Sequence, residues 1–113
     1  MEKKSLQDVR EFGADKLTKR VLFQKGESVA FVLNFQPGQT LPPHKHPGSA
    51  VFLLVVEGAG TMTVDGVATE IVRDDAICVG GDEQFAFENT GAEPARLYVA
   101  LSKVPDERYT QNI

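Results

Sequence analysis

Residues 36–60 read QPGQTLPPHKHPGSAVFLLVVEGAG, and this stretch decides how the chain folds. Prolines at positions 37, 42, 43 and 47 exclude a helix from its first half, because proline lacks an amide hydrogen and restricts the residue before it. Its second half, residues 51–56, is an unbroken apolar run of the length of one strand. The stretch therefore predicts an extended segment that leads directly into a β-strand.

The strand at residues 51–56 is apolar on both faces. A strand with one face in water alternates apolar and polar side chains, and this one does not. One face would consist of Val51, Leu53 and Val55, and the other of Phe52, Leu54 and Val56. We expect one face to point into the core and the other to meet a second sheet, the N-terminal segment or another subunit. A homodimer is the favoured expectation, because a domain of this size offers few other ways to cover a second apolar face.

The rest of the chain also favours strands. From residue 19 onward, apolar residues alternate with polar ones between short turn signals, of which Asp65-Gly66 is a strong hairpin turn. Ser5 can cap a short N-terminal helix. These patterns predict a single all-β domain, a sandwich or barrel at residues 19–104, with an N-terminal arm or short helix at 1–18 and a C-terminal tail at 105–113.

Composition excludes several classes of partner. The chain has 113 residues and a net charge of −4, without a basic cluster, so nucleic acid and anionic membranes are not expected partners. The single cysteine, Cys78, cannot form an internal disulfide and is expected to be a small buried residue. The polar N-terminus and the lack of a long apolar stretch predict a cytoplasmic protein with no membrane span.

His44 and His46 are the two histidines of the chain. At positions i and i+2 of an extended segment, both side chains point to the same side and could hold one metal ion. A metal also needs further protein ligands to be held well. From the spacing alone, a metal site and a pair of exposed loop histidines both remain open.

The spacing around the histidines resembles the first motif of the cupin superfamily. That motif is a glycine, five residues, His-x-His, three or four residues, a glutamate, six residues and a glycine. Here Gly38, His44 and His46 are followed by Val51 at the glutamate position and by Gly58. Residues 74–91 resemble a degraded second motif, and the resemblance covers about residues 19–104.

The resemblance implies a double-stranded β-helix, or jelly-roll, barrel that is commonly dimeric and has a ligand site inside. Cupins typically bind metal with His, His, Glu and His. In this chain the matching positions hold His44, His46, Val51 and Phe85, so two of the four usual ligands are apolar.

The reduced ligand set changes the expected metal. Without a carboxylate, two imidazoles favour Zn²⁺, Ni²⁺ or Cu²⁺ over Fe²⁺ or Mn²⁺, and the site can equally hold no metal. Gln84 is a candidate third ligand, since a one-residue bulge would turn it inward. No catalytic residue can be assigned from the sequence.

Three functions are consistent with the resemblance. The first is binding of a small molecule in an apolar pocket, with His44 and His46 as polar anchors. The second is a metal-dependent cupin enzyme of the isomerase, dioxygenase or lyase class, and the third is a regulatory or scaffold dimer without catalysis. The residues expected to line the pocket are Val51, Leu53, Phe85 and Phe87.

Overall fold

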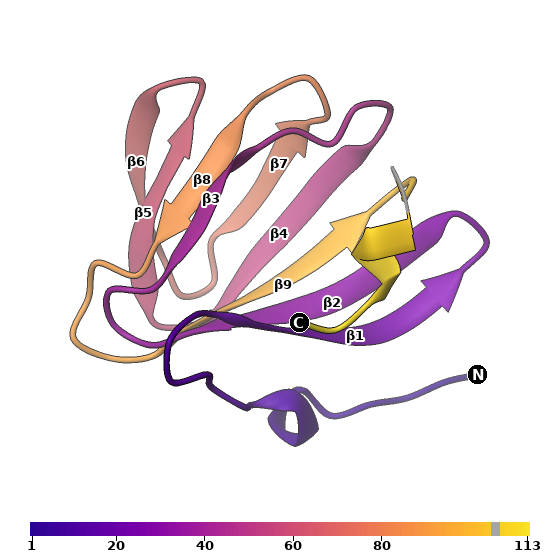
Figure 1. The fold of residues 1–113 in the computed structure, drawn as a ribbon, viewed down its shortest axis with the longest axis horizontal. Helices are drawn as coiled ribbons and strands as arrows, with labels where there is room; N and C mark the ends of the chain where they lie inside the picture. The colour runs from indigo at the N-terminus through magenta and orange to yellow at the C-terminus, as the bar shows by residue number, and fades with distance from the viewer. Residues whose placement is uncertain (105–106) are drawn as a thin grey trace.

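The computed structural model describes residues 1–104 and 107–113 (Figure 1). Two short 3₁₀ helices flank nine strands in this part of the chain. The elements are η1 (Leu6–Val9), β1 (Thr18–Lys25), β2 (Ser28–Phe35), β3 (Thr40–His44), β4 (Ala50–Glu57), β5 (Ala59–Val64), β6 (Val67–Val72), β7 (Ala76–Gly80), β8 (Phe85–Glu88), β9 (Ala95–Leu101) and η2 (Glu107–Thr110). The predicted tail begins with residues 105 and 106, which lie outside the described residues.

The strands form two antiparallel sheets that pack face to face (Figure 1). The first sheet has the order β1-β2-β9-β4-β7 and the second the order β3-β8-β5-β6. From β2 to β9 the chain alternates between the two sheets, except at the β5–β6 hairpin, which is the winding of a double-stranded β-helix. The all-β jelly-roll prediction is confirmed, as two sheets rather than one closed barrel.

The predicted turn at Asp65-Gly66 joins β5 to β6 as a two-residue hairpin. Val64 pairs with Val67, and the φ angles of Asp65 and Gly66 are 47° and 82°. Positive φ at both central residues is the conformation of a type I′ turn, whose twist matches that of the flanking strands. The turn therefore fixes the register of this hairpin.

The two faces of β4 differ in burial. Val51, Leu53 and Val55 point between the sheets and are at most 3% exposed. Phe52 and Leu54, on the other face, are 49% and 40% exposed. A single chain therefore buries only one face of β4. That a second subunit covers the other face stays a prediction.

Cys78 lies beside Phe52 on the same outer face, because these two residues are cross-strand partners of β7 and β4. Cys78 is exposed to solvent. The expectation that Cys78 is buried is wrong, since the parity of β7 turns this position outward and gives the core to Val79, which is 1% exposed.

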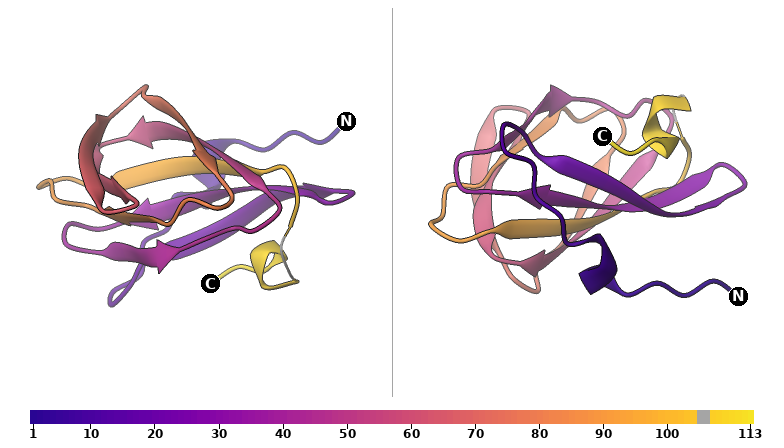
Figure 2. Two further views of the ribbon diagram at one scale, coloured as in Figure 1. Left: turned by 90° about the horizontal axis from the view of Figure 1, so that it is seen from above. Right: turned by 60° about the horizontal axis from the view of Figure 1, so that its bottom comes forward.

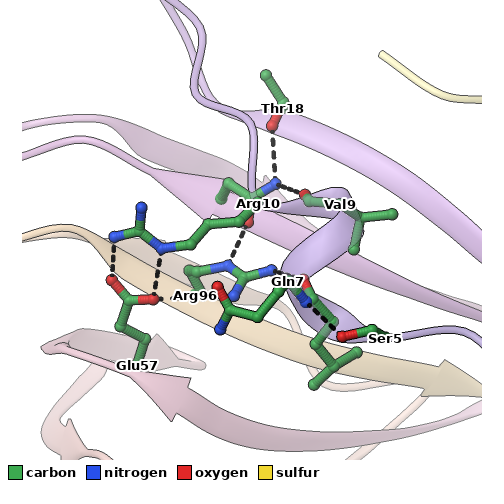
Figure 3. Close-up of polar contacts among 9 residues, drawn as sticks. Ser5, Gln7, Val9, Arg10, Thr18, Glu57 and Arg96 are labelled. Carbon is green, nitrogen blue, oxygen red and sulfur yellow. Dashed lines mark hydrogen bonds and ion pairs between the residues drawn. The ribbon is translucent and has the colours of Figure 1, made fainter.

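An N-terminal arm, residues 5–13, covers part of the first sheet (Figure 3). Ser5 caps η1 by accepting a hydrogen bond from the Gln7 amide at 3.3 Å. Arg10 donates through Nε and Nη2 to the carboxylate of Glu57, at 2.9 and 2.6 Å. This pairing holds the pKa of Glu57 below its usual value, chiefly through the hydrogen bonds from Arg10.

Arg96 is the buried centre of the arm's attachment and is only 2% exposed. Its Nε donates to Oδ1 of Asn34 at 2.7 Å, and its Nη2 donates to the Leu6 carbonyl at 2.5 Å. The Asn34 amide donates in turn to the carbonyl of Val9 and to Oγ1 of Thr18. A buried cation is tolerated only when hydrogen bonds satisfy it, so the arm is an integral part of the domain.

Both views in Figure 2 place the arm and η2 on opposite sides of the body. Neither short helix in residues 1–104 and 107–113 has the length and apolar character needed to cross a bilayer.

Replacing Asn34 by alanine should unfold the arm and destabilise the domain. The change leaves the Arg96 guanidinium and the Val9 carbonyl without their partner, which typically lowers the free energy of unfolding by about 1–3 kcal/mol. Urea denaturation measures this loss. Gln24→Ala, at an exposed position of β1, is the control and should change stability little. Equal stability of the two variants would contradict the role given to Asn34.

Candidate functional site

His44 is the last residue of β3, and His46 lies in the loop that follows. The His46 amide donates to the Gly81 carbonyl at 3.1 Å, which ties this loop to the turn between β7 and β8. A Cβ atom at position 81 would collide with the carbonyl oxygens of His46 and Ser49. Only glycine permits this close approach of the two backbones, so Gly81 determines where the His46 ring lies.

The two imidazoles line a cavity of about 130 Å³ between the sheets. Their ring centroids are 4.6 Å apart, and the Phe85 ring lies 4.7 Å from His44 and 5.4 Å from His46. Most of the wall is apolar. The lining residues are Leu17, Lys19, Phe31, Leu33, Leu41, His44, His46, Phe85, Val99, Tyr109 and Ile113.

His46 is held as a neutral imidazole. Its pKa is lowered to about 4, chiefly by burial and also by the nearby positive charges of His44 and Lys19. Its Nδ1 atom is buried and has no hydrogen-bond partner among the described residues. An unpartnered buried nitrogen is unfavourable, and a ligand able to hydrogen-bond the ring could relieve that penalty.

His44 has a defined proton position when neutral. Its Nδ1 lies 2.7 Å from the carbonyl oxygen of Pro42. A carbonyl can only accept, so Nδ1 carries the hydrogen and the lone pair is on Nε2. The pair therefore offers one acceptor nitrogen from His44 and an unsatisfied neutral ring from His46.

The structure brings together three of the predicted site residues, His44, His46 and Phe85. Val51, Leu53 and Phe87 are buried in the core but do not line this cavity, and Phe87 packs edge-on against Phe35 with centroids 4.8 Å apart. The side chain of Gln84 is exposed, while its backbone amide is bonded to Asp65 at 2.9 Å. The parity of β8 gives the inward positions to Phe85 and Phe87, so no bulge turns Gln84 toward the histidines.

Among the cavity residues that were not predicted from the sequence, Lys19 and Tyr109 are the two with polar side-chain groups. Lys19 is 7% exposed and donates from Nζ to the Tyr109 carbonyl at 3.0 Å. The same ammonium lies 4.4 Å from the centre of the Phe31 ring, a cation–π contact. Tyr109 approaches from the C-terminal segment, and its ring lies 5.0 Å from that of His46. Of these two residues, only Tyr109 had a signal in the sequence, because it is an aromatic residue in a largely polar C-terminal tail.

The groups around the imidazoles fit a resident metal ion poorly. No cluster of three or more His, Cys, Asp or Glu residues able to hold a metal occurs in residues 1–104 and 107–113. The remaining two ligand positions of the motif hold buried Val51 and the Phe85 ring, and the Lys19 charge disfavours a nearby cation. A divalent ion here would depend on two imidazoles and on ligands from outside the protein.

A model of the cupin domain matches residues 31–101. The chain belongs to the cupin family. One relative of this cupin is the tetracenomycin polyketide synthase protein TcmJ of Streptomyces glaucescens, 31% identical over 70 residues, which are 62% of this chain and 47% of that protein. Another is the dimethylsulfoniopropionate lyase DddW of Ruegeria pomeroyi, 38% identical over 58 residues, which are 51% of this chain and 38% of that protein. The cupin therefore spans less than half the length of either relative.

Solved structures with the same fold cover nearly the whole chain. TT1209 from Thermus thermophilus has 25% identity and a TM-score of 0.87, over 93% of this chain and 100% of that one. An uncharacterised protein with a double-stranded β-helix domain from Klebsiella pneumoniae has 19% identity and a TM-score of 0.84, over 98% and 94%. The second likeness bears on the fold alone.

The neutral state of His46 predicts a pH-dependent stability. Because the pKa of His46 is about 4 in the folded cupin and 6.5 as a free side chain, only the unfolded chain takes up this proton between those values. The contribution of neutral His46 to stability is thus fully present above pH 6.5 and is lost as the pH falls toward 4. In urea denaturation from about pH 7 to pH 4, wild type should lose more unfolding free energy than His46→Gln, by about 1–3 kcal/mol.

The Glu57 pairing also weakens in acid, but it is present in both proteins and cancels in this comparison. Parallel pH profiles for the two proteins would show that His46 is not held neutral by burial.

Proposed function

We propose that this cupin binds a small, largely apolar molecule in the cavity, with His44 and His46 as its polar anchors. The observation that carries the proposal is the unpartnered, neutral His46 ring in a cavity whose wall is otherwise mostly apolar. Apolar walls with a few convergent polar groups are typical of small-molecule sites. The names of the two relatives, a polyketide synthase protein and a dimethylsulfoniopropionate lyase, are compatible with an organic ligand.

A metal-dependent enzyme of the isomerase, dioxygenase or lyase class is the second candidate. One observation favours it: the Nδ1 of His44 is bonded to a carbonyl, as in most metal-binding histidines, where the contact orients the ring. The poor donor set argues against it. Metal analysis of protein without an affinity tag distinguishes the two candidates, since only the enzyme requires Zn²⁺, Ni²⁺ or Cu²⁺ that disappears in the His44→Ala, His46→Ala variant.

Small probes test the binding function directly. Phenol has a ring and one hydroxyl group, whereas toluene is similar in size and lacks a hydrogen-bonding group. Replacing both histidines by alanine should weaken phenol binding about 3- to 10-fold more than toluene binding, which is the effect of losing one hydrogen bond. Titrations followed by amide NMR shifts supply both affinities and show whether the affected residues line the cavity.

The control for this comparison is Glu70→Ala, an exposed change in β6 that should leave both affinities as in wild type. Failure of both probes to shift cavity residues would refute the binding function. Equal weakening of phenol and toluene would refute the role of the histidines as polar anchors.

We also propose that a second copy of the chain covers the outer face of the five-stranded sheet. Exposed Phe52 lines a groove of about 260 Å³ whose apolar wall also includes Phe23, Ala30 and Ala100. A two-fold axis would place the Phe52 of each copy in the groove of the other, the self-complementary contact of a symmetric dimer. This arrangement would bury the apolar face that one chain leaves in water.

Light scattering coupled to size-exclusion chromatography tests the dimer. Wild type should elute at twice the chain mass, and Phe52→Lys should shift it toward one chain mass, because the lysine would place a charge in an apolar contact. Val67→Lys, at an exposed apolar position of β6 in the other sheet, should leave the mass unchanged. A monomeric wild type at high concentration would rule out this interface.

A further inference from the structure

The C-terminal segment, residues 107–113, contributes to the wall of the cavity. Tyr109 and Ile113 line the inner cavity of about 130 Å³ and also an outer groove of about 430 Å³. The outer groove is completed by Pro42, Pro43 and Arg108, and both spaces share Lys19, Leu41 and His44. The two spaces therefore adjoin along a shared wall to which Tyr109 and Ile113 belong.

The attachment of this segment consists mainly of hydrogen bonds to one edge strand. Lys19 and Ile113 exchange backbone hydrogen bonds at 3.0 and 3.2 Å, and the Val21 amide donates to Oδ1 of Asn112 at 2.6 Å. The Lys19 ammonium adds its bond to the Tyr109 carbonyl. These contacts extend the first sheet beyond β1, its outermost strand, as Figure 1 shows where the yellow segment meets β1.

Apart from Tyr109, which is half-buried against the core, little apolar surface holds the segment in place. No residue of η2 is fully buried, and Ile113 is 57% exposed. Segments attached by solvent-accessible hydrogen bonds with few buried apolar contacts open at low free energy, while the strands of the core remain folded. Residues 107–113 can therefore detach without unfolding the two sheets.

The size of the closed cavity limits what it can hold. An apolar cavity of about 150 Å³ in another protein accommodates benzene, so about 130 Å³ corresponds to one ring. The Tyr109 ring is T-shaped against His46, and Phe31 and Phe85 also face this space. This environment suits an aromatic ring, and neutral His46 suits a hydroxyl group on it.

We propose that residues 107–113 form an opening lid whose Tyr109 restricts the closed cavity to hydroxylated ligands of one aromatic ring. With the lid displaced, the cavity joins the outer groove and accepts two fused rings. This inference rests on the proposed binding function, and it assigns Tyr109 as the residue that determines ligand size. Lys19, by holding the Tyr109 carbonyl, is the positioning residue of the lid.

The test compares phenol with 2-naphthol, which carries the same hydroxyl group on two fused rings. Wild type should bind phenol and bind 2-naphthol at least about tenfold more weakly, since a second ring forces the lid open. Tyr109→Ala should remove that discrimination by strengthening 2-naphthol binding about tenfold. Gln111→Ala, an exposed change in the same segment, is the matched control and should keep the wild-type ratio.

Lys19→Met supplies a second variant that leaves Tyr109 in the chain. It should speed hydrogen exchange at the backbone amides of positions 19, 21 and 113 and shift the ratio of the two affinities in the same direction as Tyr109→Ala. Exchange at β9 amides should stay as in wild type, which shows that the sheets remain folded.

The outcomes separate this inference from the binding function. If wild type binds phenol but Tyr109→Ala gains no affinity for 2-naphthol, the lid inference is overturned and the binding function survives. Equal binding of both alcohols by wild type also overturns the inference. If neither protein binds phenol, the proposed binding function itself fails.

Discussion

The close contact between Gly81 and the loop after β3 is the constraint on which the site depends. The backbone of the turn after β7 lies so near residues 46–49 that a side chain at position 81 would displace the loop. The loop is thereby fixed with His46 pointing between the sheets, where desolvation keeps the imidazole neutral. The apolar ring of Phe85 then completes an environment in which a hydrogen-bonding ligand is favoured over a cation.

Much of the architecture follows from local patterns. Period-two alternation and turn residues located the strands, because strand register and hairpin geometry are set over a few neighbouring residues. The His-x-His spacing located His44 and His46 on one side of an extended segment, and the motif positions of Val51 and Phe85 showed that two metal ligands are lacking. The placement of the histidines requires only residue identity and spacing, whereas the missing ligands are inferred from the resemblance to the cupin motifs.

The contacts that close the site could not be predicted in that way. Lys19 meets Tyr109 across 90 positions of sequence, and Arg96 meets Leu6 across the same separation. Lys19 looks like an ordinary exposed residue of an alternating strand until the C-terminal segment covers it. Phe87 shows the same limitation. It points inward like Phe85, as predicted, but its ring packs against Phe35 in the core and does not line the cavity. Local sequence reports the face of a strand and not the layer of side chains that a residue reaches.

The hydrogen-bond partners of Arg96 bear on where the folded domain begins in the sequence. The segment matched by the family, residues 31–101, contains Arg96 and Asn34 but neither the arm that bonds them nor β1. A fragment with those boundaries would expose the edge of β2 and leave a guanidinium in the interior without the Leu6 carbonyl. The segment that defines family membership is therefore smaller than the segment that supplies the hydrogen-bond partners of the buried Arg96.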